Sequence, residues 1–283
     1  MGGLNEMKNT SDLSELKTAG ATRPTEKTVP VSIAIITKNE EKNLPFCLAS
    51  ISRAKNIVLV DSGSTDNTIE IALKWGCRIY TEEWKGYGCQ KQSAIEKCST
   101  EWVLLLDADE TIPEETWHEI EKAIKGADFE AFSFPRKNFY RGKWLRHGYE
   151  WPDRVVRLFK KEKAGMCGSM IHESVIASKV EELNSPILHS RNNDLETYLG
   201  KLNTYSTLLA RVALENGKKG SALKAASSFL AHFFRIYLLK KGFLDGREGF
   251  IVAFTEALNT FYKYLKLMEL QEQKEVSRNT GVR

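Results

Sequence analysis

The feature that most constrains this chain is the apolar run Val103–Leu106, which ends directly in Asp107-Ala108-Asp109-Glu110. An apolar run without a polar break predicts a strand buried on both faces, as in sheets covered by helices. At the carboxyl end of such a strand, Asp107 and Asp109 point to the same side of the chain. Two hard oxygen ligands this close together suit Mg²⁺ or Mn²⁺, and such an ion in turn suits a diphosphate. The alternative interpretation is an acidic turn after a strand.

Strand and helix patterns alternate along the chain before this run. Strands are expected at Val31–Thr37, at Ile57–Val60 with Asp61 directly after it, and at Cys77–Tyr80. Helical spacing between them indicates right-handed crossovers and therefore a mostly parallel sheet flanked by helices, an α/β fold. Ligands of such sheets bind outside the carboxyl ends of the strands, where Thr37, Asp61 and Asp107 all lie.

The expected helices begin at polar residues and turn an apolar face inward. The first can be capped by Asn43 and carries Leu44, Cys47, Leu48 and Ile51. The second follows the turn at Gly63, with Ser64 or Thr65 as its cap and Ile69, Ala72 and Leu73 on its inner face.

Three motifs together resemble family 2 glycosyltransferases with the GT-A fold. They are Ile35–Glu41, Val60–Asp66 and Leu106–Glu110, and the resemblance extends over roughly Val31 to Ser190. Further along, Lys241–Gly246 resembles the branch of lipopolysaccharide-core β-glucosyltransferases. The resemblance implies a metal-assisted, inverting transfer of a hexose from a nucleotide-sugar to a glycan or lipid-linked acceptor. Glucose and a UDP-sugar donor are the expected substrates.

The resemblance also implies roles for individual residues. The nucleotide-side residues are Thr37, Glu40, Asp61 and Asp66, and the ligands of sugar-nucleotide and metal are Asp107 and Asp109. Asp66 has an equally good alternative role as a helix cap. Lys91 follows the glycine-punctuated basic stretch Trp84–Gln90. It either reaches the diphosphate as a point charge or is a solvated lysine at the start of a helix.

An inverting transfer needs a carboxylate that takes the proton of the acceptor hydroxyl while the hydroxyl oxygen attacks the anomeric carbon. The two candidates are Glu173, which follows His172, and Asp153, which lies between Pro152 and Arg154. The His-Glu pair is more similar to related glycosyltransferases, so we prefer Glu173. His172 is either a further metal or diphosphate contact or a structural histidine beside a strand.

Acceptor chemistry is expected between Phe132 and Met170, where basic and aromatic residues are mixed. They are Arg136, Tyr140, Arg146, His147, Tyr149, Trp151, Arg154 and Arg157. Aromatic rings offer flat faces to sugars, and arginine makes bidentate contacts to phosphate or carboxylate. Such a mixture also suits single-stranded nucleic acid, but no RNA-binding motif accompanies it, so nucleic acid is not an expected partner.

Composition agrees with a soluble enzyme, because 28% charged and 42% hydrophobic residues are ordinary globular values. Residues 1–29 lack the apolar core of a signal peptide, so we expect a disordered leader and no export. The catalytic domain is expected over residues 30–190 and a helical subdomain over residues 191–283. Five scattered cysteines without metal-ligand spacing indicate a reducing cytosol; they are Cys47, Cys77, Cys89, Cys98 and Cys167.

The last third has helical spacing and a basic balance. One expected helix face begins at Leu195, another runs from Leu223 to Tyr237, and a third runs from Phe250 to Met268. Between Arg211 and Met268 there are ten Lys or Arg against four Asp or Glu. No stretch reaches the about 18 uncharged residues of a membrane span. We expect most of the apolar surface to be core and the basic rim to attract anionic lipid headgroups, which would place the protein at the inner face of the cytoplasmic membrane.

Two alternatives to this function come from the same residues. One is sugar transfer to a polyprenyl phosphate, against which the lack of transmembrane segments weighs. The other is a non-catalytic module that binds sugar-nucleotides and recruits partners through its helices. Retention of both metal carboxylates and of a candidate base favours the enzyme.

Overall fold

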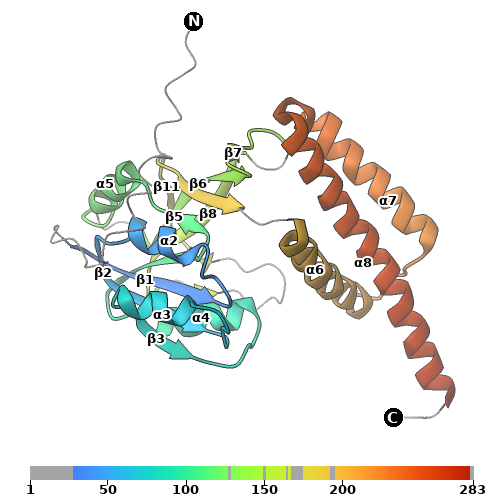
Figure 1. The fold of residues 1–283 in the computed structure, drawn as a ribbon, viewed down its shortest axis with the longest axis horizontal. Coiled ribbons are helices and arrows are strands. Elements are labelled where there is room, and N and C mark those ends of the chain that lie inside the picture. The colour runs from blue at the N-terminus through green and yellow to red at the C-terminus, as the bar shows by residue number, and fades with distance from the viewer. Residues whose placement is uncertain are drawn as a thin grey trace, which may run out of the picture.

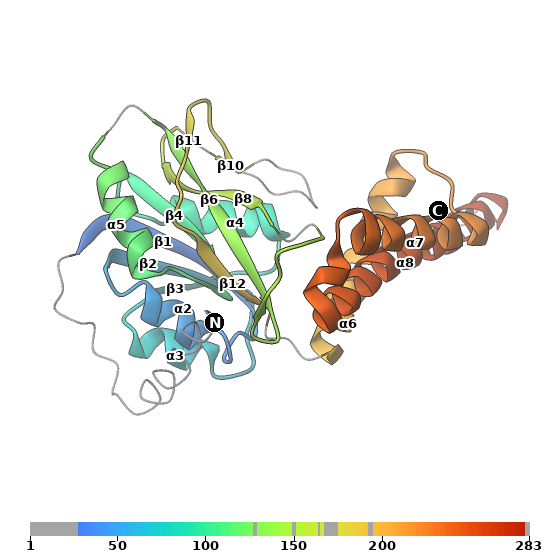
Figure 2. The same ribbon diagram turned by 90° about the horizontal axis from the view of Figure 1, so that it is seen from above.

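The computed structural model describes residues 28–126, 129–148, 151–163, 165–166, 175–191 and 195–280. A β-sheet with its covering helices occupies one side of the molecule, and three long helices occupy the other (Figures 1 and 2). The change from strands to long helices falls between Arg191 and Leu195.

The main sheet runs in the order β3-β2-β1-β4-β8-β6-β12-β5, with β7 and β11 paired to β6. Its strands are β1 (Val29–Thr37), β2 (Ala54–Asp61), β3 (Arg78–Thr81), β4 (Trp102–Asp107), β5 (Glu110–Thr111), β6 (Ala131–Tyr140), β7 (Lys143–Trp144), β8 (Asp153–Lys160), β11 (Val180–Glu182) and β12 (Ile187–Arg191). A separate small sheet pairs β9 (Gly165–Met166) with β10 (Val175–Ile176). The first four strands are parallel, as the alternation of strands and helices predicted. The α/β class is confirmed, and the sheet becomes mixed where β8 runs antiparallel to β4.

Helices cover both faces of the parallel strands, which explains their unbroken apolar runs. The helices α2 (Leu44–Ser50), α3 (Thr68–Lys74) and α5 (Glu114–Ala123) share one core with Ile33 and Ile35 of β1. The helix α4 (Tyr87–Glu96) packs on the opposite face, where Ala34 of β1 lies. Because alternate residues of a strand face opposite sides, consecutive apolar side chains from Ile33 to Ile36 of β1 enter the two cores in turn.

The register of the parallel strands brings their carboxyl ends together. Thr37 lies opposite Asp61, and Ile36 lies opposite Asp107. The prediction that these polar residues share one edge of the sheet is therefore confirmed. The edge faces the helical part of the molecule.

Two expectations about α3 are wrong. Leu73 is 62% exposed, because only Ala72 and Thr68 of this short helix are buried in the core. Neither Ser64 nor Thr65 caps the helix, which begins at Thr68. Instead, the backbone N–H of Thr68 donates to the Asp66 carboxylate at 3.0 Å, so the capping carboxylate comes from two residues before the helix.

The helical part consists of α6 (Leu195–Glu215), α7 (Ala222–Phe234) and α8 (Gly246–Thr280). A π-helical turn (Arg235–Leu239) and a 3₁₀ turn (Gly242–Asp245) join α7 to α8. α8 packs against both α6 and α7, so α7 is the helix farthest from the sheet (Figure 1). Within the described residues, none of the helices has the length and apolar character that crossing a membrane requires.

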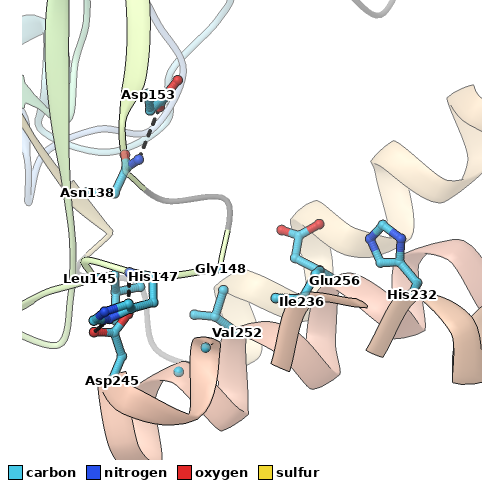
Figure 3. A pocket seen from close by; sticks show the side chains of 12 residues that line it. Asn138, Leu145, His147, Gly148, Asp153, His232, Ile236, Asp245, Val252 and Glu256 are labelled. Carbon is cyan, nitrogen blue, oxygen red and sulfur yellow. Dashed lines mark hydrogen bonds and ion pairs between the residues drawn. The ribbon is translucent and has the colours of Figure 1, made fainter. Parts of the chain in front are cut away.

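Asp245 fastens the helical part to the sheet part. Its buried carboxylate accepts hydrogen bonds from the backbone N–H groups of Arg146 (3.0 Å) and His147 (2.8 Å), and it lies 3.0 Å from Nδ1 of His147. Lys143 donates to the Asp245 carbonyl oxygen at 2.5 Å. The segment Lys241–Gly246, which carried part of the family resemblance, therefore joins the two parts (Figure 3).

Close approach at Gly249 tests how tightly the start of α8 packs on the turn that carries Asp245, the residue of this junction. A Cβ at Gly249 would collide with the carbonyl oxygen of Gly242 and lie 2.9 Å from Cβ of Asp245. We expect Gly249→Ala to lower the free energy of unfolding by about 1–3 kcal/mol in urea denaturation. Gly200→Ala in α6 is the matched control, since open space surrounds that position, and it should stabilise by about 0.5–1 kcal/mol. Equal behaviour of the two variants would contradict a tight junction.

Candidate active site

A cleft opens between the carboxyl ends of the parallel strands and the helices α6 and α8. Its volume of about 820 Å³ lies within the usual range for small-molecule sites. The charged side chains that line it are Glu40, Lys91, Asp107, Asp109, Arg136, Arg154, Arg157, His189, Lys201 and Glu256. Asp107 and Asp109 thus face the same cavity, as their spacing after β4 predicted.

Two cations hold Asp107. One carboxylate oxygen lies 2.8 Å from Nζ of Lys91, and the other lies 2.5 Å from Nη2 of Arg157. Burial raises the pKa of Asp107, but the charges of Arg157 and Lys91 outweigh it and hold the pKa well below its ordinary value. Lys91 is buried in α4, so the alternative of a solvated lysine is wrong.

Asp109 pairs with a histidine that the sequence patterns did not single out. Nε2 of His189 on β12 lies 3.4 Å from Oδ2 of Asp109. Burial raises the pKa of Asp109, but the interaction with His189 outweighs it and the net shift is downward. Nδ1 of His189 lies 2.7 Å from Oδ1 of Asn138. Because the Asn138 amide nitrogen donates to Asp153, this network assigns a proton to Nδ1 of His189 and leaves Nε2 facing Asp109.

A chain of polar contacts links the two aspartates, and the backbone of residues 107–109 closes it into a ring. From Asp107 it passes through Arg157 to Glu110 (2.7 Å), and from Glu110 through Arg136 (3.2 Å) to Asp153 (2.8 Å). It returns from Asp153 through Asn138 and His189 to Asp109. Figure 3 shows the contact between Asp153 and Asn138. Because Glu110 is fully buried, its charge depends on the two arginines that it contacts.

Thr37 and Asp61 lie outside the described lining of the cleft. The Thr37 hydroxyl donates to Asp61 at 2.9 Å, and the same carboxylate accepts from the backbone N–H groups of Gly63 and Ser64 at 2.9 and 2.8 Å. Asp61 therefore shapes the turn after β2. Its role toward a nucleotide stays a prediction.

Asp66 joins two neighbouring loops. Besides capping α3, its carboxylate accepts from the backbone N–H of Glu41 at 3.1 Å. Burial raises the pKa of Asp66, but hydrogen bonds from Thr68 and Glu41 outweigh it and the pKa lies below its ordinary value. This geometry favours the capping alternative.

Glu40 lines the cleft beside the aspartates. Burial raises its pKa, and the charge of Asp109 adds to the effect against a hydrogen bond from Asn43. A carboxylate in this environment holds a proton more readily than a surface glutamate does. Its place in the cleft agrees with the expected nucleotide-side position.

Of the two candidate bases, Asp153 lies among the residues that the structure describes. Asp153 lines a second cavity between the sheet and the helical part, together with His147, Asp245 and Glu256 (Figure 3). Its carboxylate is engaged by Arg136 and Asn138. Glu173 and His172 lie outside the described residues.

The basic and aromatic residues expected to bind an acceptor do not form one surface. Arg136 and Arg157 belong to the ring of contacts around Asp107 and Asp109. His147 takes part in the junction with Asp245, and Tyr140 is buried. Arg136 and Arg157 also line the cleft, and His147 lines a second cavity, so a role of these residues toward an acceptor stays a prediction.

Three side chains of the cleft were missed by the sequence analysis. His189 comes from the end of β12, and Lys201 and Glu256 come from α6 and α8. No short motif surrounds any of them. Their positions depend on pairing and packing between distant segments, which local patterns do not report.

The acidic and histidine side chains of the cleft are the ones available to a divalent ion. Among the described residues there is no group of three or more His, Cys, Asp or Glu side chains that could hold one. Asp109 and His189 form a pair whose facing atoms are 3.4 Å apart, and adjacent ligands of an octahedral ion lie about 3 Å apart. The pair fits an ion that takes its remaining ligands from phosphate and water.

A sheet whose strand ends present paired carboxylates and cations to a cleft of this size defines an enzyme site. The chain belongs to glycosyl transferase family 2, whose family model matches residues 32–178. It is 30% identical over 255 residues to the lipopolysaccharide core biosynthesis glycosyltransferase LpsC of Rhizobium meliloti (85% of this chain, 93% of that protein). It is 29% identical over 263 residues to the uncharacterized glycosyltransferase RT0209 of Rickettsia typhi (88% of this chain, 89% of that protein). Among solved structures it is similar to S. aureus TarS in complex with UDP-GlcNAc, with a TM-score of 0.44 and 14% identity (89% of this chain, 92% of that chain).

Removal of Arg157 tests the ring of contacts. Arg157→Met leaves Asp107 and the buried Glu110 without their shared cation, so we expect the free energy of unfolding to fall by about 3–5 kcal/mol. Adding Glu110→Gln should recover part of that loss, because it removes one of the uncompensated charges.

Arg78→Met on β3 is the matched control for that experiment. Arg78 is exposed, and its replacement should change stability by less than about 0.5 kcal/mol. Urea denaturation measures all three variants. If Arg157→Met behaved like Arg78→Met, the ring would not be a determinant of stability.

Proposed function

We propose that this protein is an inverting hexosyltransferase that moves glucose from a UDP-sugar to a lipid-linked glycan of the lipopolysaccharide-core type. The observation that carries the proposal is the pair Asp107 and Asp109, held by a closed ring of contacts at the strand ends of the cleft. Membership of glycosyl transferase family 2 and the 30% identity to LpsC support the reaction and the acceptor class.

The diphosphate of the donor would lie between Asp109 and the two cations that now hold Asp107. Lys91 supplies a point charge and Arg157 a fork of donors, and both side chains are already aimed into the cleft. Asp109 and His189 would hold Mg²⁺ or Mn²⁺ from the protein side. A divalent ion bound there would neutralise charge on the departing nucleoside diphosphate.

The transfer itself needs a general base. In our proposal Glu173 takes the proton of the acceptor hydroxyl, whose oxygen forms the bond to the anomeric carbon as the bond to the diphosphate breaks. UDP leaves with the electron pair of that bond, and the configuration at the anomeric carbon inverts. Asp153 remains the second candidate, although its contacts with Arg136 and Asn138 stabilise it as a structural carboxylate.

The acceptor would enter from the side of the helical part. Tyr198, Lys201 and Tyr205 of α6 line this wall of the cleft. The ring of Tyr205 is stacked parallel to that of Tyr87, with centroids 6.0 Å apart, and such aromatic faces suit sugar rings. We place the acceptor at the cytoplasmic face of a membrane.

A transfer assay with UDP-glucose tests the function. Purified protein freed of metal by EDTA should release UDP from UDP-glucose only when Mn²⁺ or Mg²⁺ is restored, and faster with a lipopolysaccharide-core acceptor. Donor binding without any UDP release would indicate the non-catalytic module. Release stimulated by polyprenyl phosphate instead of core glycolipid would indicate the other alternative.

Asp109→Asn tests the proposed metal ligand. The change keeps the size and hydrogen bonding of the side chain but removes its charge, so we expect UDP release to fall by more than about 100-fold at an unchanged melting temperature. Glu101→Gln, at the opposite end of β4, is the control and should keep wild-type activity. Near wild-type turnover of Asp109→Asn would refute the metal assignment.

Glu173→Gln tests the proposed base. Because the carboxylate acts on the acceptor, the variant should bind UDP-glucose like wild type and yet transfer at a rate lower by about 100-fold or more. Calorimetry of donor binding and the transfer assay separate these two effects. Full activity of Glu173→Gln together with an inactive Asp153→Asn would assign the base to Asp153.

A further inference from the structure

The hairpin formed by α7 and the start of α8 exposes large apolar side chains to solvent. Of nineteen such side chains in the described part of the chain, nine fall between residues 223 and 254: Leu223, Leu230, Phe234, Leu238, Leu239, Phe243, Leu244, Phe250 and Phe254. Leu223, Leu230 and Leu239 are 81%, 65% and 66% exposed. The expectation that most of the apolar surface here is core is therefore wrong.

On α7 the exposed apolar residues form one stripe. Leu223, Leu230 and Phe234 are spaced by seven and then four residues, which places them on one side of a helix. Lys224 and Arg235 follow the first and last of them in the sequence, and both residues are exposed. The Lys224 ammonium lies 5.2 Å from the centroid of the Tyr264 ring of α8. α7 lies on the far side of α8 from the sheet (Figure 1), and all three residues of the stripe are exposed.

A different side of α7 from the one that carries the stripe packs on α8. Phe229 and Phe233 point toward α8, where the Phe229 ring lies 5.4 Å from that of Phe254 and the Phe233 ring lies 5.8 Å from that of Phe250. These aromatic contacts attach α7 to α8. The side of α7 that carries Leu223, Leu230 and Phe234 stays exposed to solvent.

The charged residues that accompany the stripe in the sequence are almost all basic. The segment from Lys218 to Arg247 contains seven Lys or Arg and a single acidic residue, Asp245. Asp245 is buried and engaged by His147, so it adds no negative charge to this surface. Apolar side chains bordered by cations match a layer of anionic headgroups above acyl chains.

We propose that this outer face of α7 and of the turn before α8 docks into the surface of an anionic lipid bilayer. The leucine and phenylalanine side chains enter the boundary of headgroups and acyl chains, and the lysines and arginines contact the anionic headgroups. A second copy of the chain would fit this face of α7 less well than an anionic bilayer does. A symmetric dimer through this face would bring two sets of seven cations together.

Docking of this kind differs from attraction by a basic rim alone. Electrostatic attraction is screened within about 10 Å at 0.1 M salt, whereas burial of apolar surface is not. Binding should therefore weaken in high salt without disappearing. The proposal rests on the proposed function only for its location beside a lipid-linked acceptor, because vesicle binding requires neither donor nor transfer.

Co-sedimentation of the full chain with vesicles tests the proposal. Wild type should bind phosphatidylglycerol-containing phosphatidylcholine vesicles more strongly than pure phosphatidylcholine vesicles, and part of the binding should survive high salt. The triple variant Leu230→Ser, Phe234→Ser, Leu239→Ser should lower the partition coefficient on the order of 100-fold, because three large side chains no longer enter the bilayer. Lys240→Glu with Lys241→Glu should abolish the preference for anionic vesicles.

Matched controls keep the result specific. Leu73→Ser removes a similarly exposed leucine from α3, and Lys122→Glu with Lys125→Glu reverses charge near the end of α5; neither should change vesicle binding. The melting temperature and UDP release of each variant show that it is folded. Unchanged binding of the triple variant, complete loss of wild-type binding in high salt, or a wild-type dimer that the triple variant converts to monomers would each overturn the proposal. Because UDP release is measured separately, failure of docking is distinguishable from failure of the proposed function.

Discussion

The contact of Arg157 with both Asp107 and Glu110 is the interaction on which the rest of the site depends. It joins the end of β4 to β8, where the parallel half of the sheet meets the antiparallel half. Glu110 has no access to water, so its charge is tolerable only with a cation beside it. The same cation keeps Asp107 ionised. Folding and the electrostatics of the cleft are thus coupled through a single guanidinium group.

From that point the polar ring extends in both directions and sets the positions of the other functional groups. Asn138 holds His189 at one nitrogen and so directs the other toward Asp109. Preorganisation of this kind lowers the cost of assembling a charged site when the donor arrives. Asp245 then fixes the helical part against residues 146–147, which gives the cleft its second wall. The helical wall of the cleft and the strand ends that face it therefore come from different parts of the chain. Contacts of the buried carboxylates of Glu110 and Asp245 hold them in place.

Local patterns predicted the strands and their carboxyl ends well, because an unbroken apolar run has one favourable environment, a sheet covered on both faces. They failed for Leu73 and for the cap of α3, where a short helix is too small to bury a whole face and a carboxylate two residues upstream reaches its first N–H groups. They did not predict the contacts that the arginines of β6 and β8 make with Glu110. Arginine is suited both to phosphate and to a buried carboxylate, and Glu110 lies in another strand.

The sequence by itself determined the α/β class, the family, and the position of Asp107 and Asp109 at the end of a buried strand, because these follow from periodicity and from motifs of neighbouring residues. Only the tertiary structure decided which groups surround the two aspartates. Lys91, Arg157 and His189 come from a helix and two other strands, and no local rule connects them. It also decided that the outer side of α7 is exposed. The periodicity of a helix shows that it has an apolar face, but whether that face is covered depends on how many neighbouring helices the fold provides. In the described part of the chain, the main helical neighbour of α7 is α8.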